Sequence, residues 1–310
     1  MTDHFETSIA ADANFTRLTS TRGAAVIAES LPAAPDTVRR TSVWVVCSLA
    51  AAAVVGCATS MTQLSALPAK HSVKSDQLLV LSDFKIARDD PLIIELQELR
   101  KDVRETLLVP MQEQKVVVYL FSDEAEYTEY MKNTYPNLPP RRAFFIGSPA
   151  ELAVYAFWGD QVRVDLRHEY THGLLHAGLK SVPLWLDEGI AEYFEVSSKD
   201  HKRINIEHAH RLSTAVQNGW RPDLRRLESL EDVAEMHRLD YQESWAWVHF
   251  LLHDSPDSRL LLLDYLTELR DTDQPSSLAE RIEAEMPYAS DRLLGYVGGF
   301  FLPHATAAAF

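Results

Sequence analysis

The stretch His168-Glu169-Tyr170-Thr171-His172 places two histidines four residues apart, in a segment with the spacing of an amphipathic helix. Residues i and i+4 of a helix lie on one face about one turn apart, so both imidazoles can reach a single metal ion. Glu169 then lies beside that ion and can take a proton from a metal-bound water. The pattern therefore predicts a metal-binding helix with Glu169 as its general base.

A third metal ligand is expected from the segment that follows, PLWLDEGIAEYF at residues 183–194. A catalytic zinc site needs three protein ligands and one open position for water. Glu188 is the best candidate, because the fifteen residues between His172 and Glu188 let the first helix end, the chain turn and a second helix return alongside. We therefore predict one Zn²⁺ per chain, bound by His168, His172 and Glu188.

Together, the two segments resemble the metal-binding segments of the gluzincin zinc metallopeptidases. The resemblance is carried by HEYTH at residues 168–172 and WLDEGIAEYF at residues 185–194. In those enzymes the third ligand is a glutamate on the next helix, often within W-x-x-E-G-x-A. The short interval between the ligands is more similar to the small bacterial peptidase MA-like domains, and the resemblance covers the region from about Asp76 to Leu293. It implies a zincin-like fold and hydrolysis of a peptide or protein substrate.

Glu192 is the competitor of Glu188, because it lies one turn farther along the same helical face. In thermolysin-like gluzincins an acidic residue at this offset hydrogen-bonds a ligand histidine and fixes its tautomer. The resemblance therefore implies that Glu188 binds the metal and Glu192 supports a ligand histidine, with the reverse assignment open. His176 continues the row of histidines, but it lies about 12 Å along the helix axis from His168, too far to share one ion.

A further stretch, DYQESWAWV at residues 240–248, looks like the helix start that follows the metal site in the MA-like domains, where a tyrosine faces the cleft. Peptide hydrolysis needs a hydrogen-bond donor at the oxygen where negative charge develops. The resemblance implies that Tyr241 is this donor. The alternative is that Tyr241 only packs at the end of a helix.

Three other interpretations of the same residues remain open. The histidines of residues 168–172 can be ordinary helix residues, with DEGIAE as an acidic first turn favoured by the helix dipole. The domain can bind zinc without catalysis and act as a binding or assembly module, although zinc binding alone does not require Glu169. The site can also belong to a zinc amidase that cleaves cell-wall peptides rather than proteins.

The sequence around the metal-binding segments predicts an α+β fold. Residues 116–121 and 77–84 have the apolar, β-branched character of buried strands, and residues 91–107 have the spacing of an amphipathic helix. Residues 143–147 and 152–158 predict a hairpin around Ser-Pro-Ala. Residues 152–158 are either an exposed edge strand that binds the substrate backbone or a fully covered strand.

After residue 194 the sequence predicts helices only. Apolar residues at helical spacing occupy four segments, with prolines between them as breakers: residues 204–217, 241–252, 259–270 and 278–285. The expected architecture is a zincin-like two-lobed domain, in which a small mixed β-sheet with the active-site helix is followed by an all-helical C-terminal lobe. The metal is expected in the cleft between the lobes.

The N-terminal region has the pattern of an export signal. Arg39 and Arg40 precede thirteen largely apolar residues, 43–55, which are too few for a membrane span of about 20 residues. Val-Val-Gly-Cys at residues 54–57 resembles the lipobox of bacterial lipoproteins, in which the cysteine, here Cys57, carries the lipid and becomes the mature N-terminus. This implies export and a lipid anchor on the cell envelope, with the outer membrane as the default destination. A plain signal peptide or an uncleaved anchor remains open.

We therefore divide the chain into a leader and signal peptide (residues 1–56), a lipidated flexible tether (57–76) and a metallopeptidase domain (77–310). Residues 1–37 are polar and unpatterned, which predicts a disordered leader or a translation start farther downstream. The two cysteines, Cys47 and Cys57, both precede the domain, so it has neither a disulfide nor a thiol nucleophile.

Net charge argues against nucleic acid as a partner. The chain has 45 acidic and 30 basic residues, a net charge of −15, and an acidic domain is a poor nucleic-acid binder. The pairs Arg141-Arg142 and Arg225-Arg226 are too short for basic patches and are expected to be solvated surface. The expected partners are a peptide or protein substrate and the membrane. The sequence predicts no oligomeric state.

Overall fold

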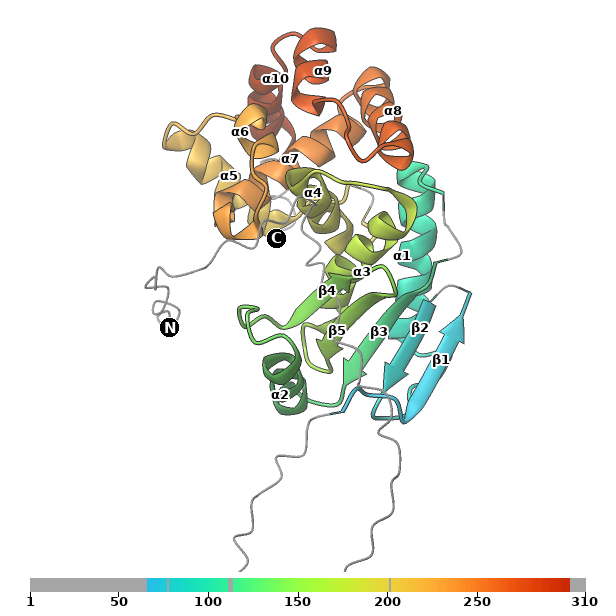
Figure 1. Cartoon of the computed structure of the whole chain (residues 1–310). Coiled ribbons are helices and arrows are strands. Elements are labelled where there is room, and N and C mark those ends of the chain that lie inside the picture. The colour runs from blue at the N-terminus through green and yellow to red at the C-terminus, as the bar shows by residue number, and fades with distance from the viewer. Residues whose placement is uncertain (1–65, 77, 111–113, 201, 302–310) are drawn as a thin grey trace, which may run out of the picture.

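The structure is a computed structural model that describes residues 66–76, 78–110, 114–200 and 202–301. Within these residues the chain combines ten α-helices with one five-stranded mixed β-sheet (Figure 1). The predicted combination of a small mixed sheet with many helices is confirmed. The sheet lies at the bottom of the view in Figure 1, helices α5 to α10 gather at the top, and α3 and α4 lie between them.

The sheet has the strand order β1-β2-β3-β5-β4. Its three central strands run parallel, and β1 and β4 pair antiparallel to their neighbours at the two edges. The strands are β1 His71–Ser75, β2 Leu78–Ser82, β3 Val116–Phe121, β4 Ala143–Gly147 and β5 Leu152–Phe157. The hairpin predicted around Ser-Pro-Ala is confirmed as the pair of β4 and β5.

The structure decides between the two interpretations of residues 152–158. Strand β5 is covered on both sides, because it pairs with β3 on one side and with β4 on the other. The edge strand next to the helix that carries His168 and His172 is β4 instead. The backbone N–H of Phe145 in β4 points away from β5 and donates a 2.6 Å hydrogen bond to Glu169 on α3. The free edge of the sheet therefore faces the helix that carries the histidines.

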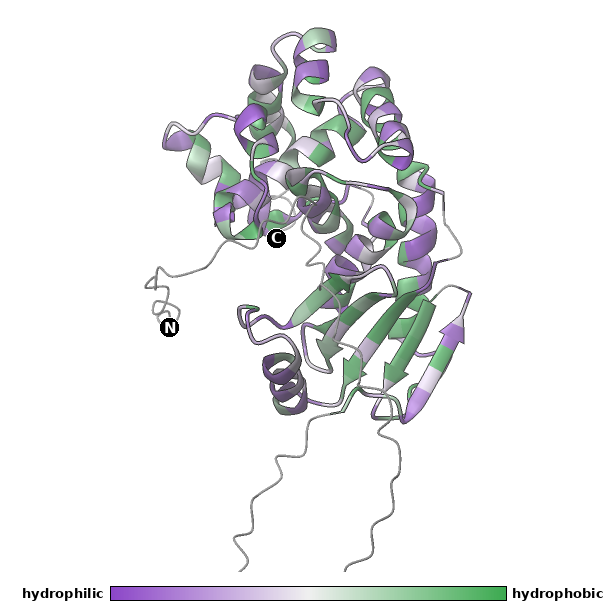
Figure 2. Cartoon of the chain, viewed as in Figure 1, coloured by the Kyte–Doolittle hydropathy of each residue, from purple (hydrophilic) through white to green (hydrophobic). Residues whose placement is uncertain are grey.

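Strand β3 lies between two apolar clusters, which explains why all six of its residues are apolar and buried. Alternate side chains of a strand point to opposite faces of the sheet. Val116, Val118 and Leu120 belong to the main core, while Val117, Tyr119 and Phe121 belong to a smaller aromatic cluster with Tyr127 and Tyr130 of α2. Figure 2 shows the central strands as almost continuously hydrophobic and β1 as the polar strand.

The helices follow the order of the chain, and most of those after residue 194 match a predicted segment. Their bounds are α1 Pro91–Leu107, α2 Glu124–Thr134, α3 Val162–Gly178, α4 Leu184–Glu195, α5 Ile206–Gln217, α6 Leu224–Glu228, α7 Arg238–His253, α8 Pro256–Asp271, α9 Leu278–Glu285 and α10 Ala289–Tyr296. A 3-10 turn, Val233–Glu235, precedes α7, and a π-helical turn, Val297–Phe301, follows α10. None of the described helices is long and apolar enough to cross a membrane.

Helix α4 packs between α3 and α7, and two glycines allow the close approaches. A Cβ on Gly189 of α4 would lie 2.5 Å from the backbone oxygen of Ser244 in α7. A Cβ on Gly173 of α3 would lie 2.6 Å from Cγ1 of Val116 in β3. These contacts are too short for any real side chain, so the two glycines fix how deeply α3 and α4 are set into the core.

Four helices and strands match no segment predicted from the sequence, namely β1, α2, α6 and α10, and one of them lies in the stretch expected to be tether. Strand β1, His71–Ser75, lies within the stretch expected to be tether, so the folded domain begins before residue 77. Its sequence is polar and buries only Val73, which gives little strand signal. Helix α2 is also largely polar and gives a weak helix signal for the same reason. The signal segment and Cys57 lie outside the described residues.

Candidate metal centre

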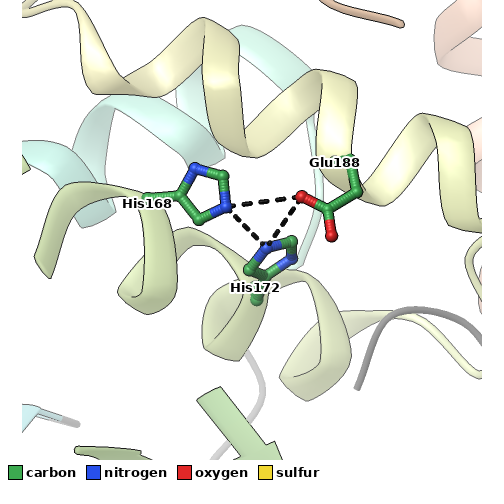
Figure 3. Close-up of side chains that lie close together, drawn as sticks. All are labelled: His168, His172 and Glu188. Atoms are coloured by element: carbon green, nitrogen blue, oxygen red, sulfur yellow. Dashed lines mark hydrogen bonds and ion pairs between the residues drawn. The ribbon is translucent and has the colours of Figure 1, made fainter. Parts of the chain in front are cut away.

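Three predicted ligands come together at the crossing of α3 and α4. The Nε2 atoms of His168 and His172 lie 3.2 Å apart, and Oε2 of Glu188 lies 3.4 Å from the first and 3.7 Å from the second (Figure 3). Donor atoms about 2.0–2.1 Å from a tetrahedral zinc ion are about 3.3–3.4 Å apart. The triangle therefore has the size that one ion requires.

The burial of Glu188 supports the same interpretation. Its side chain is 3% exposed, and Oε2 receives no hydrogen bond from any described group. A buried carboxylate oxygen without a donor is unfavourable unless a cation or another partner compensates it. The unpaired oxygen is the one that faces the two histidines. The three residues therefore fit a metal ion through their geometry and through the chemistry of the donor set.

Each of the two histidines also has a carboxylate beside its Nδ1 atom, the ring nitrogen that does not face Glu188. Nδ1 of His168 lies 2.9 Å from Glu195, and Nδ1 of His172 lies 2.9 Å from the fully buried Asp187. The second contact is close but poorly aligned, so it is an ion pair rather than a standard hydrogen bond. A proton held on Nδ1 by a carboxylate leaves the lone pair of Nε2 free for a metal. Both rings are therefore oriented to offer Nε2.

Glu192 lies near His168, but among the described residues its hydrogen-bond partner is a different histidine from the one expected. Glu192 instead pairs with Nε2 of His208 on α5, at 2.7 Å. The contacts expected of Glu192 are made by Asp187, next to Glu188 in the sequence, and by Glu195, one turn beyond Glu192. Sequence spacing places both 192 and 195 on the face of Glu188. The position of α5, which brings His208 to Glu192, decides that Glu195 and not Glu192 pairs with His168.

The reverse assignment, with Glu192 on the metal, has weaker support. Donor atoms of His168, Glu192 and Glu195 also lie within 4.8 Å of one another. That group contains one histidine, and both its carboxylates already contact an imidazole. The group with Glu188 contains both histidines and an unpaired carboxylate oxygen. The described residues therefore favour Glu188.

The electrostatics of the centre favour a cation. Burial lowers the pKa of His168, yet Glu188 and Glu195 outweigh it and raise this pKa well above its usual value. Asp187 and Glu188 raise the pKa of His172 in the same way, against burial. Burial opposes the charge of Asp187, but the neighbouring histidines hold its pKa below its usual range. The same carboxylates that stabilise imidazolium ions would stabilise a divalent cation.

Glu169 lies where α3 meets the edge strand. Its side chain is half-buried, and Oε2 accepts the 2.6 Å hydrogen bond from the backbone N–H of Phe145. This contact fixes the carboxylate against the strand beside the histidine pair. A general base needs to be held within reach of the water that it deprotonates.

Tyr241 begins the second turn of α7 and is half-buried. Burial raises the pKa of its hydroxyl, the charge of Glu188 raises it further, and Arg141 lowers it. The phenol therefore lies within the electrostatic reach of a predicted metal ligand. Its expected role as a hydrogen-bond donor to the substrate stays a prediction.

His176 joins the network in a way that the sequence did not predict. Its Nε2 lies 2.9 Å from Oδ2 of Asp187, whose other oxygen faces His172. Asp187 is thus shared by two histidines of α3. The signal available from the sequence was the i, i+4 continuation of the histidine row, which excludes His176 as a ligand but leaves it on the same face.

No family model matches the chain, and no curated protein matches it either.

Proposed function

We propose that the chain is a zinc metallopeptidase of gluzincin type, with a zincin-like two-lobed fold. The observation that carries the proposal is the triangle of His168, His172 and Glu188, whose size suits one tetrahedral ion and whose carboxylate oxygen is buried and unpaired. A zinc ion held there would act as a Lewis acid and lower the pKa of a coordinated water. The site needs no further protein ligand.

The residues around the triangle have separate roles in this proposal. Glu169 takes a proton from the attacking water and returns it to the leaving amine. Tyr241 donates its hydroxyl proton in a hydrogen bond to the carbonyl oxygen as that oxygen becomes negative. Asp187 and Glu195 hold the two imidazoles with Nε2 inward. Zinc binding alone does not require a general base, so the presence of Glu169 supports a catalytic site over a zinc-binding module.

The edge strand gives the substrate a place to bind. An extended peptide can add to β4 as a further strand, because the free edge of β4 faces α3. The backbone of that peptide would then pass close to Glu169, which is bonded to the same edge. We further propose that the domain is exported and is anchored to the membrane by a lipid on Cys57.

The test is the metal content and the peptidase activity of the full chain, with Glu169→Gln as the variant. We expect one equivalent of zinc in both proteins, and cleavage that falls by about 10²- to 10⁴-fold in the variant, the usual contribution of a general base. The control is Glu285→Gln, the same change at an exposed glutamate of α9, which should alter neither.

Other outcomes separate the alternatives. Zinc in both proteins without cleavage of any peptide would favour a binding or assembly module. Cleavage of purified cell-wall peptides but not of unfolded proteins would favour a zinc amidase. Absence of zinc from the wild-type chain would refute the proposal and return the histidines to the role of helix residues.

A further inference from the structure

Arg141 lies at the entrance to the edge strand, two residues before β4 begins at Ala143. Its backbone oxygen accepts a 3.0 Å hydrogen bond from the hydroxyl of Tyr127 on α2, which holds the chain in place at this point. Its side chain is exposed, with Cζ 5.9 Å from the centre of the Phe144 ring. The guanidinium is thus supported by an aromatic ring and remains accessible.

The charge of Arg141 has no acidic partner among the described residues. No carboxylate of the described residues lies within 4.0 Å of it, whereas its neighbour Arg142 makes a bidentate pair with Asp165 at 2.7 and 3.0 Å. The two arginines that look equivalent in the sequence therefore differ. Arg142 fastens the loop to the start of α3, whereas Arg141 makes no ion pair among the described residues and contacts the hydroxyl of Tyr241, which leaves the rest of its planar fork for a ligand.

Arg141 lies close to two tyrosines, Tyr127 and Tyr241, and its guanidinium is within hydrogen-bonding reach of the Tyr241 hydroxyl. Burial and then Glu188 raise the pKa of Tyr241, and Arg141 lowers it. Burial and then Glu169 raise the pKa of Tyr127, and Arg141 lowers it as well. The contact of Arg141 with Tyr241, a residue close enough to Glu188 to feel its charge, places the guanidinium near the proposed metal ligand.

We propose that Arg141 binds a carboxylate of the peptide substrate and makes the enzyme selective for peptides with a negative charge near the scissile bond. The inference rests on the proposed peptidase function. Arginine binds carboxylates through two parallel hydrogen bonds, which gives both affinity and geometric selectivity. A peptide added to β4 advances about 3.3 Å per residue, so a carboxylate about two to four residues from the bond opposite Phe145 would reach the guanidinium.

The carboxylate can come from an acidic side chain or from the C-terminus of the peptide, and the test has an arm for each. One arm compares peptides with glutamate or glutamine at each position within four residues of the cleaved bond. The other compares a free C-terminal acid with its amide. Cleavage is measured as kcat/KM for the full-length wild-type chain, Arg141→Gln, Arg141→Lys and the matched control Arg142→Gln.

We expect the wild-type chain to prefer the charged peptide of one arm by about ten- to hundredfold, the usual effect of a charge-assisted hydrogen bond. Arg141→Gln should reduce this preference to less than about twofold, with cleavage of neutral peptides retained, and Arg141→Lys should restore part of it. Arg142→Gln should keep the full preference. Equal cleavage of charged and neutral peptides by the wild type, or an equal loss of both in Arg141→Gln, would overturn the inference.

A binding measurement separates failure of the inference from failure of the proposed function. The same fluorescent peptides are titrated against Glu169→Gln, alone and combined with Arg141→Gln, and anisotropy gives the dissociation constants. Selective binding of charged peptides through Arg141 without any cleavage by the wild type would refute the peptidase and keep the carboxylate site. Cleavage without selectivity in either assay would keep the peptidase and refute the carboxylate site.

Discussion

Two pairs of histidines in this chain have the same spacing and opposite surroundings. His168 and His172 on α3 have ring centres 4.8 Å apart, and His249 and His253 on α7 have ring centres 4.4 Å apart. The first pair has carboxylates on both sides. The second is packed among aromatic rings, and His249 bonds to the hydroxyl of Tyr296 and the backbone oxygen of Lys202.

The surroundings change the chemistry of the rings in opposite directions. Carboxylates raise the pKa of both histidines of the first pair, against the effect of burial. In the second pair, burial lowers the pKa of the fully buried His249 to about 3, and the neighbouring His253 and the cation Arg203 add to this effect. Spacing alone therefore does not decide whether a histidine pair favours a positive charge. The acidic residues that α4 brings to α3 make the difference.

The variant with the largest expected effect removes the charge of Glu188, the carboxylate that faces both histidines of the first pair. Glu188→Gln should lower zinc affinity by more than about a hundredfold, because it removes a ligand, whereas partners of ligands contribute about 10- to 100-fold. Competition with a chelator measures the affinity. His253→Gln, which removes one ring of the second pair, should leave zinc binding unaltered. Equal zinc affinities for wild type and Glu188→Gln would show that Glu188 is not a metal ligand.

A second test asks which carboxylates support the rings of the first pair at their Nδ1 atoms. Asp187→Asn should lower zinc affinity by about 10- to 100-fold, since the amide orients His172 less well and withdraws a negative charge from the centre. Glu192→Gln should have a smaller effect, because Glu192 pairs with His208 and not with a ligand. If Glu192→Gln weakens zinc binding more than Asp187→Asn, Glu192 rather than Asp187 supports the metal ligands.

The third test acts where α4, which brings Glu188 to the first pair, touches α7, which carries the second pair. Gly189→Ala places a Cβ 2.5 Å from the Ser244 oxygen, so α4 and α7 must separate. Such overpacking lowers the free energy of unfolding by about 1–3 kcal/mol, and chemical denaturation measures the change. Gly295→Ala, on α10 with open space around its Cβ position, should cause no loss of stability. A tolerated Gly189→Ala would show that the two helices are less tightly coupled.

The comparison also shows what local sequence patterns can predict. The bounds of α1, β3 and α9 agree with the segments predicted from the sequence, because apolar spacing is a property of a few neighbouring residues. The triangle of ligands followed from spacing on two helices. The pairing of β5 with β3, and hence the position of the edge strand, joins segments that are distant in sequence and left no local signal.

The supporting residues of the site could not be predicted for the same reason. Glu192 and Glu195 share a helical face with Glu188, and spacing gives no reason to choose between them. The choice depends on His208, which α5 brings to Glu192 across the fold. Arg141 and Arg142 are likewise equivalent in the sequence. Only Asp165 on α3 makes them different.

The smallest expected effect concerns the second pair and the pH dependence of stability. The folded chain holds the pKa of His249 at about 3, and an unfolded histidine has a pKa near 6.5. As the pH falls below about 6.5, the unfolded chain therefore binds a proton that the folded chain does not. His249 thus lowers the free energy of unfolding by about 1 kcal/mol per pH unit between pH 6 and pH 5.

His249→Gln should remove this part of the slope, because an amide does not titrate and can still donate to Lys202 and accept from Tyr296. Urea unfolding at pH 5.0, 5.5, 6.0 and 6.5 measures the difference in slope between wild type and variant, in which the contributions of other groups cancel. His71→Gln, on the exposed face of β1, is the control and should keep the wild-type slope. The first pair predicts the opposite sign, since its histidines have a raised pKa in the folded chain. An unchanged slope in His249→Gln would mean that its ring accepts a proton in the folded chain, and the contrast between the two pairs would then be lost.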